Sequence, residues 1–296
     1  DHIRLGLAVA LIYITRGEQK HDHIRLGLAV ALIPLYEGEK MNPISSTKND
    51  DIKYLKKLYK TRKRKQKGKF VLEGVRIINE AYKADADLEK IFITPDYNKD
   101  KLNFDLSQID VKYVEKNLLE KIADTVSPQG IIAVVNEFQY RLNNFSEKRS
   151  ILVLDRIQDP GNMGTLIRTA VAAGIEGIIA LKGCVDIYNL KVIRSTMGAI
   201  FKIPILAKVD FNHFHQIYNN NFNLITADLS GEYFHHELQY EEPLMLVVGN
   251  EANGVRSQIL KLSDYIVKIP IIGEIDSLNA AIAGGIILFE YVSQNQ

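Results

Sequence analysis

The stretch that decides the fold is ILVLDRIQDPGNMGTLIR, residues 151–168. Its first four residues are all apolar, which is typical of a strand buried on both faces. The turn Asp159-Pro160-Gly161-Asn162 can start a helix over Met163–Ala173, and Gly174 stands where a glycine commonly ends a helix. A buried strand, a polar turn and a helix in this order predict an α/β domain.

The same alternation continues through the rest of the chain. Continuous apolar strands separated by helices predict a mostly parallel sheet covered on both faces, over residues 150–296. The predicted strands are Gly177–Leu181, Ile203–Val209, Leu224–Leu229 and Leu244–Val248, and the predicted helices are Leu190–Met197 and Leu278–Tyr291. Ligands bind beyond the carboxyl ends of such strands. Residues 159–168, 247–254 and 269–279 fall there.

Residues 41–145 form a separate small α/β domain in this prediction, and the polar, aperiodic residues 141–148 form the linker. Its strands are Phe70–Leu72, Leu88–Thr94, Val111–Val114 and Ile131–Val135, and its helices begin near Ile52, at Val75 and at Lys116.

Charge is distributed unevenly between these two parts. Residues 41–149 hold 22 Lys/Arg and 16 Asp/Glu, a net of +6, whereas residues 150–296 hold 10 and 15, a net of −5. Lys53 to Lys69 contains ten Lys/Arg and no acid. A charge run is usually a solvated helix face, but phosphate contact explains this one better. The predicted RNA contacts are Lys53, Lys56, Lys57, Lys60, Arg62, Lys63, Arg64 and Lys65.

Other site classes find little support in the sequence. His213, His215, His235 and His236 lack the cysteines or adjacent carboxylates of a zinc site, so we expect no metal. The single cysteine, Cys184, excludes an internal disulfide framework and indicates a cytoplasmic setting. No apolar run approaches the ~20 residues that span a bilayer, so no membrane partner is expected.

Residues 1–40 are set apart by an exact duplication. Asp1–Ile12 recurs at Asp22–Ile33, and Met41 begins a segment that reads like a natural start. Two copies are too few for a solenoid. We interpret these residues as a foreign extension, with a docking amphipathic segment as the alternative.

Each polar turn by itself has an ordinary structural explanation. Asn162 could cap a helix, Arg168 could be a surface cation, and Ser277 and Asn279 could start the last helix. The Gly249-Asn-Glu-Ala-Asn-Gly254 turn is neither a phosphate-binding loop nor a dinucleotide fingerprint.

Taken in order, these three stretches resemble the three motifs of the SpoU/TrmH class of SPOUT methyltransferases. Residues 44–135 resemble the L30e-like substrate-binding domain common in front of it. The resemblance implies a deep trefoil knot, a homodimer, and S-adenosylmethionine bound by Gly249, Asn250, Ile269 and Leu278.

The resemblance also implies the reaction, methylation of an RNA ribose 2′-OH. It places Arg168 nearest that oxygen. Because the pKa of an arginine exceeds about 12, an electrostatic stabiliser is the preferred role, with a general base as the alternative. The orienting residues would be Asn162, Glu251, Ser277 and Asn279. Arg194 would contact a phosphate or form a surface salt bridge. We expect 23S ribosomal RNA as the substrate, with transfer RNA, or a non-catalytic RNA-binding or ribosome-assembly role, as alternatives.

Overall fold

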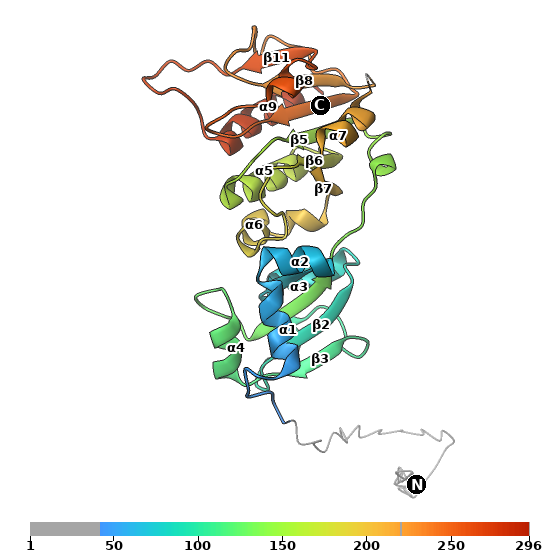
Figure 1. The fold of residues 1–296 in the computed structure, drawn as a ribbon, viewed down its shortest axis with the longest axis vertical. Coiled ribbons are helices and arrows are strands. Elements are labelled where there is room, and N and C mark those ends of the chain that lie inside the picture. The colour runs from blue at the N-terminus through green and yellow to red at the C-terminus, as the bar shows by residue number, and fades with distance from the viewer. Residues whose placement is uncertain (1–41, 220, 296) are drawn as a thin grey trace, which may run out of the picture. The chain divides into compact units, whose positions relative to one another are not determined.

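The computed structural model describes residues 42–219 and 221–295, and residues 41–296 form one compact unit. The predicted foreign extension, residues 1–40, lies outside the described residues. Two sheets are present, one built from residues 69–136 and the other from residues 150–268 (Figure 1).

The N-terminal sheet has four strands in the order β1-β4-β2-β3. β4 is antiparallel to both of its neighbours, and β2 and β3 are parallel. The strands are β1 (Lys69–Glu73), β2 (Leu88–Ile93), β3 (Asp110–Tyr113) and β4 (Ile131–Asn136), and the helices are α1 (Asp50–Leu58), α2 (Thr61–Lys67), α3 (Val75–Lys83) and α4 (Lys116–Ile122).

The basic run of the sequence folds into two helices. Asn49 caps α1 by accepting from the backbone N–H groups of Asp51 and Ile52, and Ile52, Leu55 and Leu58 are buried beneath it. The second helix, α2, ends at Gly68, which has a φ of +63° and therefore suits glycine. The buried positions recur at helical spacing, so the remaining positions of α1 carry its lysines outward.

The C-terminal sheet has seven strands in the order β7-β6-β5-β10-β8-β11-β9, and every described pair is parallel. The strands are β5 (Ser150–Leu154), β6 (Gly177–Leu181), β7 (Ile205–Val209), β8 (Asn223–Ala227), β9 (Tyr233–Phe234), β10 (Leu244–Val248) and β11 (Tyr265–Lys268). The parallel α/β fold predicted from the sequence is confirmed. The strand order alone does not define the knot, which stays a prediction.

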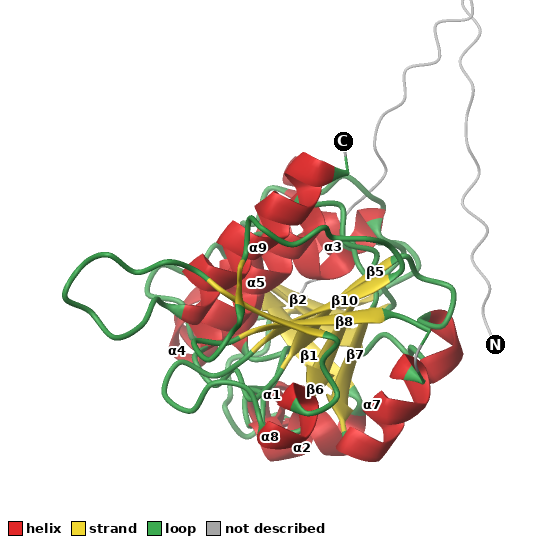
Figure 2. Cartoon of the chain, turned by 90° about the horizontal axis from the view of Figure 1, so that it is seen from above, coloured by secondary structure: helices red, strands yellow, loops and turns green. Residues whose placement is uncertain are grey.

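Helices cover both faces of this sheet (Figure 2). Leu152 and Leu154 pack on one face with α5 (Pro160–Ala172) and α9 (Ala280–Gln294). Ile151 and Val153, which alternate with them, pack on the other face with α7 (Phe211–Tyr218). Burial on both faces explains why β6 and β10 are apolar at every position and β5 at all but Ser150.

Several boundaries differ from the predicted ones. α5 begins at Pro160, and its cap is Asp159, which accepts from the N–H of Asn162; Asn162 is therefore inside the first turn and is not the cap. α9 begins at Ala280, with Asn279 as its cap. The sequence did not predict α2, α7, α8 (Ser257–Leu260), β9 or β11 as separate elements. α6 (Leu190–Thr196) ends one residue earlier than expected. In the part of the chain that the structure describes, no helix meets the length and hydropathy of a membrane span.

Candidate functional site

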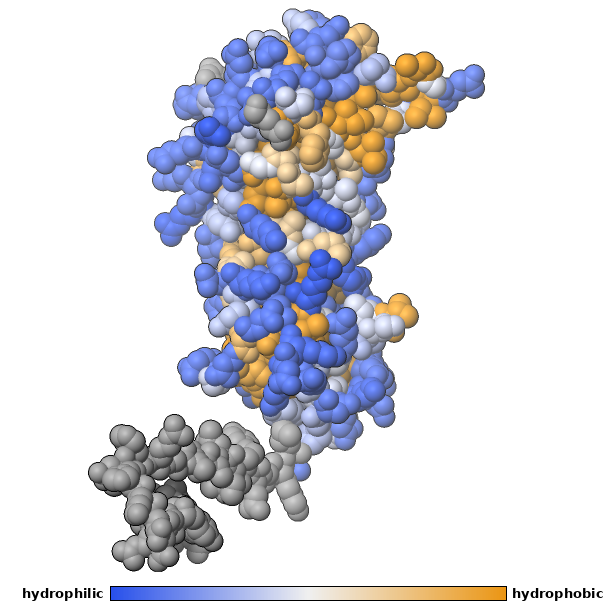
Figure 3. Space-filling model, turned by 180° about the vertical axis from the view of Figure 1, so that it is seen from behind, coloured by the Kyte–Doolittle hydropathy of each residue, from blue (hydrophilic) through white to orange (hydrophobic). Residues whose placement is uncertain are grey.

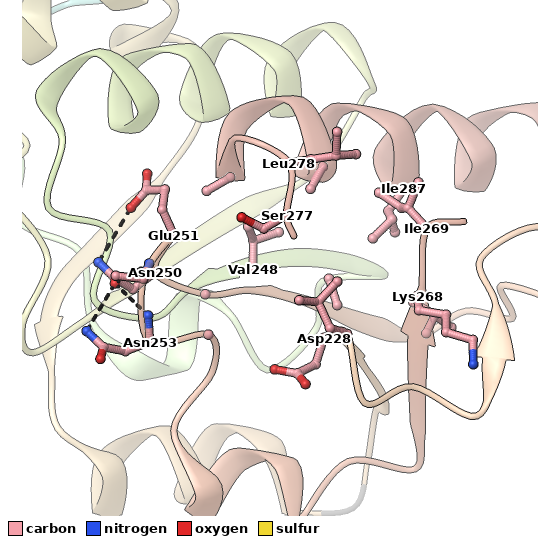
Figure 4. Close-up of a pocket in the computed structure, with 18 of the residues that line it drawn as sticks. Asp228, Val248, Asn250, Glu251, Asn253, Lys268, Ile269, Ser277, Leu278 and Ile287 are labelled. Atoms are coloured by element: carbon pink, nitrogen blue, oxygen red, sulfur yellow. Dashed lines mark hydrogen bonds between the residues drawn. The ribbon is translucent and has the colours of Figure 1, made fainter. Parts of the chain in front are cut away.

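A cavity of about 300 Å³ opens at the carboxyl ends of β8, β10 and β11 (Figure 4). Asp228 follows β8, Gly249 follows β10 and Ile269 follows β11, so parallel strands bring three loops to one edge. Ser277 and Leu278, just before α9, close a further side. Val248, Leu278 and Ile287 give the cavity apolar walls (Figure 4).

The cavity collects most of the residues that the sequence nominated. Gly249, Asn250, Ile269 and Leu278, the four predicted cofactor contacts, all line it. Two of the predicted orienting residues, Glu251 and Ser277, line it as well. Asn162, Asn279 and Arg168 are not among its lining residues.

The turn after β10 is shaped by the side chain of Asn250. Its Oδ1 accepts from the N–H groups of Ala252 and Asn253 at 2.9 and 3.1 Å, while the backbone of Asn250 pairs with Gly254 in both directions. At Gly249 an added Cβ would lie 2.5 Å from the carbonyl carbon of Gly254. This close approach requires glycine. Because Gly249 has no side chain, backbone atoms form this edge of the cavity.

Asp155 anchors both ends of this turn, one through its backbone N–H and the other through its buried carboxylate. Asp155 is fully buried at the end of β5, and its backbone N–H donates to the oxygen of Val248. Its carboxylate accepts from the backbone N–H and from Nε of Arg256, each at 2.8 Å. Sequence reasoning missed this pair. The acid that directly follows the apolar run of β5 was the available signal, because buried carboxylates need partners.

Arg156 supports the middle of the same turn. It has a φ of +59°, which non-glycine residues rarely adopt. Its carbonyl accepts from Nδ2 of Asn250 at 3.1 Å, and its Nη2 donates to the oxygen of Gly254 at 3.2 Å. The loop is therefore held at its start, middle and end from the end of β5.

Asn162 joins the three predicted motifs. Its Nδ2 donates to Oε1 of Glu251, and its Oδ1 accepts from Nδ2 of Asn279 at 2.9 Å. Oδ1 of Asn279 is used as the cap of α9. A hydrogen-bonded chain thus runs beside the cavity from the amide of Asn279 through the amide of Asn162 to the carboxylate of Glu251.

Arg168 lies apart from this chain. It is exposed on α5, and it makes no hydrogen bond or ion pair to residues 42–219 or 221–295. Its guanidinium is therefore available to a substrate or to another subunit, and the single subunit does not place it in the cavity.

The cationic face of the N-terminal domain is mostly exposed. Lys56, Lys57, Lys60, Arg62 and Lys65 are exposed, Lys53 is exposed and pairs with Asp50 at 2.9 Å, and Lys63 is half-buried. Arg194 pairs with Asp124 at 3.0 Å, and both side chains are about half exposed.

Arg64 corrects the predicted set of RNA contacts. Its side chain is only 3% exposed, and it donates to Asp186 at 2.8 Å and to the oxygens of Leu58 and Tyr59. Every part of the guanidinium is engaged by protein, so Arg64 cannot contact phosphate in this conformation. It is a structural residue that links α2 to the segment after β6.

No cluster of three metal-ligating side chains occurs among the described residues. His213 pairs with Asp210 at 2.7 Å, and the rings of His235 and His236 pack edge to face. Burial raises the pKa of the Cys184 thiol to about 11, which makes it a poor nucleophile at neutral pH.

Comparison with known proteins gives consistent matches. Residues 149–289 match the SpoU rRNA Methylase family, and residues 49–133 match an MRM3-like substrate binding domain. The chain is 30% identical to the 23S rRNA (guanosine(2553)-2′-O)-methyltransferase RlmP of Bacillus subtilis, over 84% of this chain and 98% of that protein.

Solved structures agree with these matches. The AdoMet-bound rRNA methyltransferase from Sinorhizobium meliloti superimposes with a TM-score of 0.76 at 28% identity, covering 84% of this chain and 96% of that one. The SpoU methyltransferase AviRb from Streptomyces viridochromogenes, in complex with AdoMet, gives 0.77 at 26% identity, covering 83% and 98%.

Proposed function

Because this chain belongs to the SpoU rRNA methylase family, we propose that it methylates a ribose 2′-OH of ribosomal RNA, using S-adenosylmethionine. The observation that carries the proposal is the hydrogen-bonded set Asn162–Glu251–Asn279 beside the cavity. It joins three stretches far apart in the chain at the one place where a cofactor and a ribose could meet.

The cavity suits S-adenosylmethionine by its chemistry. Apolar walls at Val248, Leu278 and Ile287 can pack against a flat adenine, and the backbone turn at Gly249 lets it approach closely. Asp228 and Glu251 supply carboxylates, which complement the positive charges of a sulfonium and an ammonium. When bound, the cofactor supplies an electrophilic methyl carbon on a positively charged sulfur.

The residues of the chain would position the hydroxyl for this transfer. Glu251 lines the cavity, and its orientation is fixed by Asn162, which is itself fixed by Asn279. Ser277 offers a hydroxyl at the same edge. Positioning of this kind supplies a large part of the rate in a displacement reaction.

Arg168 would stabilise the oxygen as it loses its proton. A guanidinium stays protonated at neutral pH, so it acts through its charge and not as a base. Because Arg168 is exposed and outside the cavity lining, this role requires the RNA or a second subunit to complete the site.

A homodimer would complete the site around Arg168. Ile282 and Phe289 of α9 are 56% and 50% exposed, and Ile272 and Ile275 of the preceding loop are 98% and 59% exposed. Figure 3 shows apolar residues gathered on the protruding segment and the surface beside it. Gly285 of α9 lies against Thr169 of α5, so the helix that carries Arg168 packs against α9.

Contiguous exposed apolar surface of this kind marks an association site. A second copy would bury it and carry Arg168 into the interface. Sedimentation analysis of the full chain and of Phe289→Asp tests the dimer: we expect the substitution to give monomers, and a monomeric parent chain refutes the proposal.

Ribosomal RNA is the proposed substrate because an MRM3-like substrate binding domain precedes the catalytic domain and carries the exposed lysines. Transfer RNA is the alternative substrate. A cytoplasmic setting is also proposed, since the sequence contains only one cysteine.

The reaction is tested by incubating the protein with radiolabelled S-adenosylmethionine and either ribosomal or transfer RNA from cells that lack the gene. Nuclease digestion and nucleoside analysis should give a 2′-O-methylnucleoside from ribosomal RNA alone. Label on a base, or on transfer RNA alone, would contradict the proposal. Absence of both label and cofactor binding would favour a non-catalytic RNA-binding role.

A further inference from the structure

A second cavity, of about 230 Å³, lies where the N-terminal domain meets α6. Arg76 and Ile77 of α3, together with Gln129, line it from the N-terminal domain. Ile193, at 2% exposure, and Met197, at 48% exposure, line it from α6 and the residue after it. Its walls therefore come from the segments that match the substrate binding domain and the methylase family.

The lining combines an apolar wall with polar and charged groups, among them Arg194 and the carboxylates of Glu73 and Glu80. Both carboxylates already have partners in the protein: Glu73 accepts from the hydroxyl of Tyr59 and from two backbone N–H groups, and Glu80 pairs with Lys83 and Lys202. Ile77, Ile193 and Met197 form the apolar part. Oε1 of Gln129 accepts from the N–H of Val75 at 3.0 Å, which fixes the amide and leaves its nitrogen available to donate. Arg76 is exposed, and among the described residues no carboxylate pairs with it.

The backbone is arranged to keep Gln129 in place. Gly74 has a φ of +100°, and a Cβ there would stand 3.0 Å from Oε1 of Gln129. Only glycine accepts both the conformation and the close approach without strain. The hydrogen bond from Val75 and the close contact with Gly74 thereby hold the side-chain amide of Gln129 at the wall of the cavity.

This cavity is one helix away from the proposed catalytic residues. A Cβ on Gly164 of α5 would lie 2.3 Å from Cβ of Ser195 and 2.8 Å from the oxygen of Val192, so α5 and α6 are in direct contact. Gly164 is two residues from Asn162 in the same helix. The helix whose first turn holds Asn162 therefore packs directly on the helix that lines the second cavity.

We propose that this cavity binds an unpaired nucleotide of the RNA substrate, near the nucleotide that is methylated. The base would lie against Ile193 and Met197, Gln129 would donate to an acceptor on its edge, and Arg76 would contact its phosphate. Proteins recognise RNA sequence mainly at unstacked bases, which stack on aromatic rings or on Arg guanidinium planes. In this cavity the guanidinium of Arg76 or Arg194 would offer such a plane beside the apolar wall. The inference rests on the proposed function, because it assumes an RNA substrate.

The test uses binding, so that it is separate from catalysis. The affinity of the full-length protein for transcribed 23S rRNA is measured by filter binding, and that for S-adenosylmethionine by calorimetry. Met197→Trp fills the cavity and Gln129→Ala removes the donor. Tyr82→Trp, on an exposed part of α3 outside the cavity, is the control.

We expect both cavity variants to weaken RNA binding roughly tenfold, as removal of one stacked base does, and to leave cofactor affinity unchanged. The control should bind like the parent. Unchanged RNA affinity in a folded Met197→Trp, or an equal loss in Tyr82→Trp, overturns the proposal. Should Met197→Trp fail to fold, an unchanged affinity in Gln129→Ala overturns it. Methylation of ribosomal RNA by the parent is scored separately and decides the proposed function.

Discussion

The side-chain amide of Asn162 donates to the carboxylate of Glu251, so the first turn of α5 is bonded to the loop that follows β10. Asn279 completes the arrangement by donating to the oxygen of the same amide. Because an amide offers one donor and one acceptor side, Asn162 is suited to link a carboxylate with a second amide.

Asn162→Asp should therefore be more harmful than Asn162→Ala. The aspartate would place a second carboxylate against Glu251, and like charges at contact distance repel. We expect kcat/KM for methyl transfer to fall on the order of 100-fold in Asn162→Asp and about tenfold in Asn162→Ala, or ~2.7 and ~1.4 kcal/mol. Steady-state kinetics at saturating cofactor measure this. Equal loss in the two variants would show that the charge is irrelevant.

Arg168→Ala should lower the rate of methyl transfer on the order of 1,000-fold, because it removes the proposed stabiliser of the developing alkoxide. Cofactor and RNA affinities should stay within about threefold of the parent, since Arg168 lies outside the cavity lining. Calorimetric titration with S-adenosylmethionine checks this, and Arg168→Lys is the matched control for charge. Lost cofactor binding in a folded Arg168→Ala would sink the assigned role.

The exposed lysines and the buried Arg64 should respond differently to substitution. Changing Lys56, Lys57, Lys60 and Lys65 to Gln should weaken RNA binding. It should also reduce the slope of log affinity against log salt by about one for each phosphate that the protein no longer neutralises. The readout is RNA binding at several salt concentrations. An unchanged slope would refute phosphate contact.

Arg64→Ala serves as the contrast. It leaves the carboxylate of Asp186, itself 5% exposed, without its partner, so it should lower the free energy of unfolding by roughly 3–5 kcal/mol. Denaturant titration measures that loss. The salt slope of RNA binding by the folded fraction should be that of the parent.

Asp155 and Arg256 should behave as one unit. Removing either leaves the other charge without its main partner, and Asp155 is fully buried, so Asp155→Ala should cost about 3–5 kcal/mol of unfolding free energy. The double variant should lose less than the sum of the single losses. Both single variants should also weaken S-adenosylmethionine binding, because the pair anchors the turn after β10. Additive losses with unaltered cofactor affinity would contradict this.

Glu137 should make the fold less stable as pH rises. Burial raises the pKa of its carboxyl, with Asp186 adding to the rise, and its Oε1 is buried with no hydrogen-bond partner among the described residues. The folded state therefore holds the proton more tightly than the unfolded chain. Stability falls as pH increases from the ordinary value of 4.5 through the raised one.

Glu137→Gln keeps the shape of the side chain and removes this titration. We expect it to raise the melting temperature at pH 8 and to change it little at pH 4, as followed by circular dichroism. A variant that melts below the parent at pH 8 would show that the carboxylate is stabilising.

Much of the fold and of the cofactor site could be predicted because their signals are local. The continuous apolar runs of residues 151–154 and 244–248 are enough to indicate strands that are buried on both faces. Gly249, Ile269 and Leu278 were predicted from the resemblance to the SpoU/TrmH class, and all three line the cavity.

The features that escaped prediction depend on partners far along the chain. In sequence Arg64 resembles every other cation of its run, and the partner of its charge, Asp186, lies 122 residues away. Asp155 directly follows the apolar run of β5, which signals that it needs a partner, but Arg256 lies 101 residues away and no local pattern identifies it. The role of Arg168 was predicted from the resemblance alone. A second subunit would complete its site only if it binds the exposed apolar surface of α9 and the loop before it.

The position of β10 between β5 and β8 has a consequence for how the chain reaches its native state. β5 and β10 pair along their whole length, yet β6, β7, β8 and β9 lie between them in sequence. Contacts this distant are slow to form, because the closure of the intervening segment must come first. Until β10 inserts, β5 and β8 each present an unpaired edge, a surface on which incomplete chains aggregate. β10 carries the cofactor turn, and its late insertion into the sheet should therefore also limit how much of the protein folds correctly.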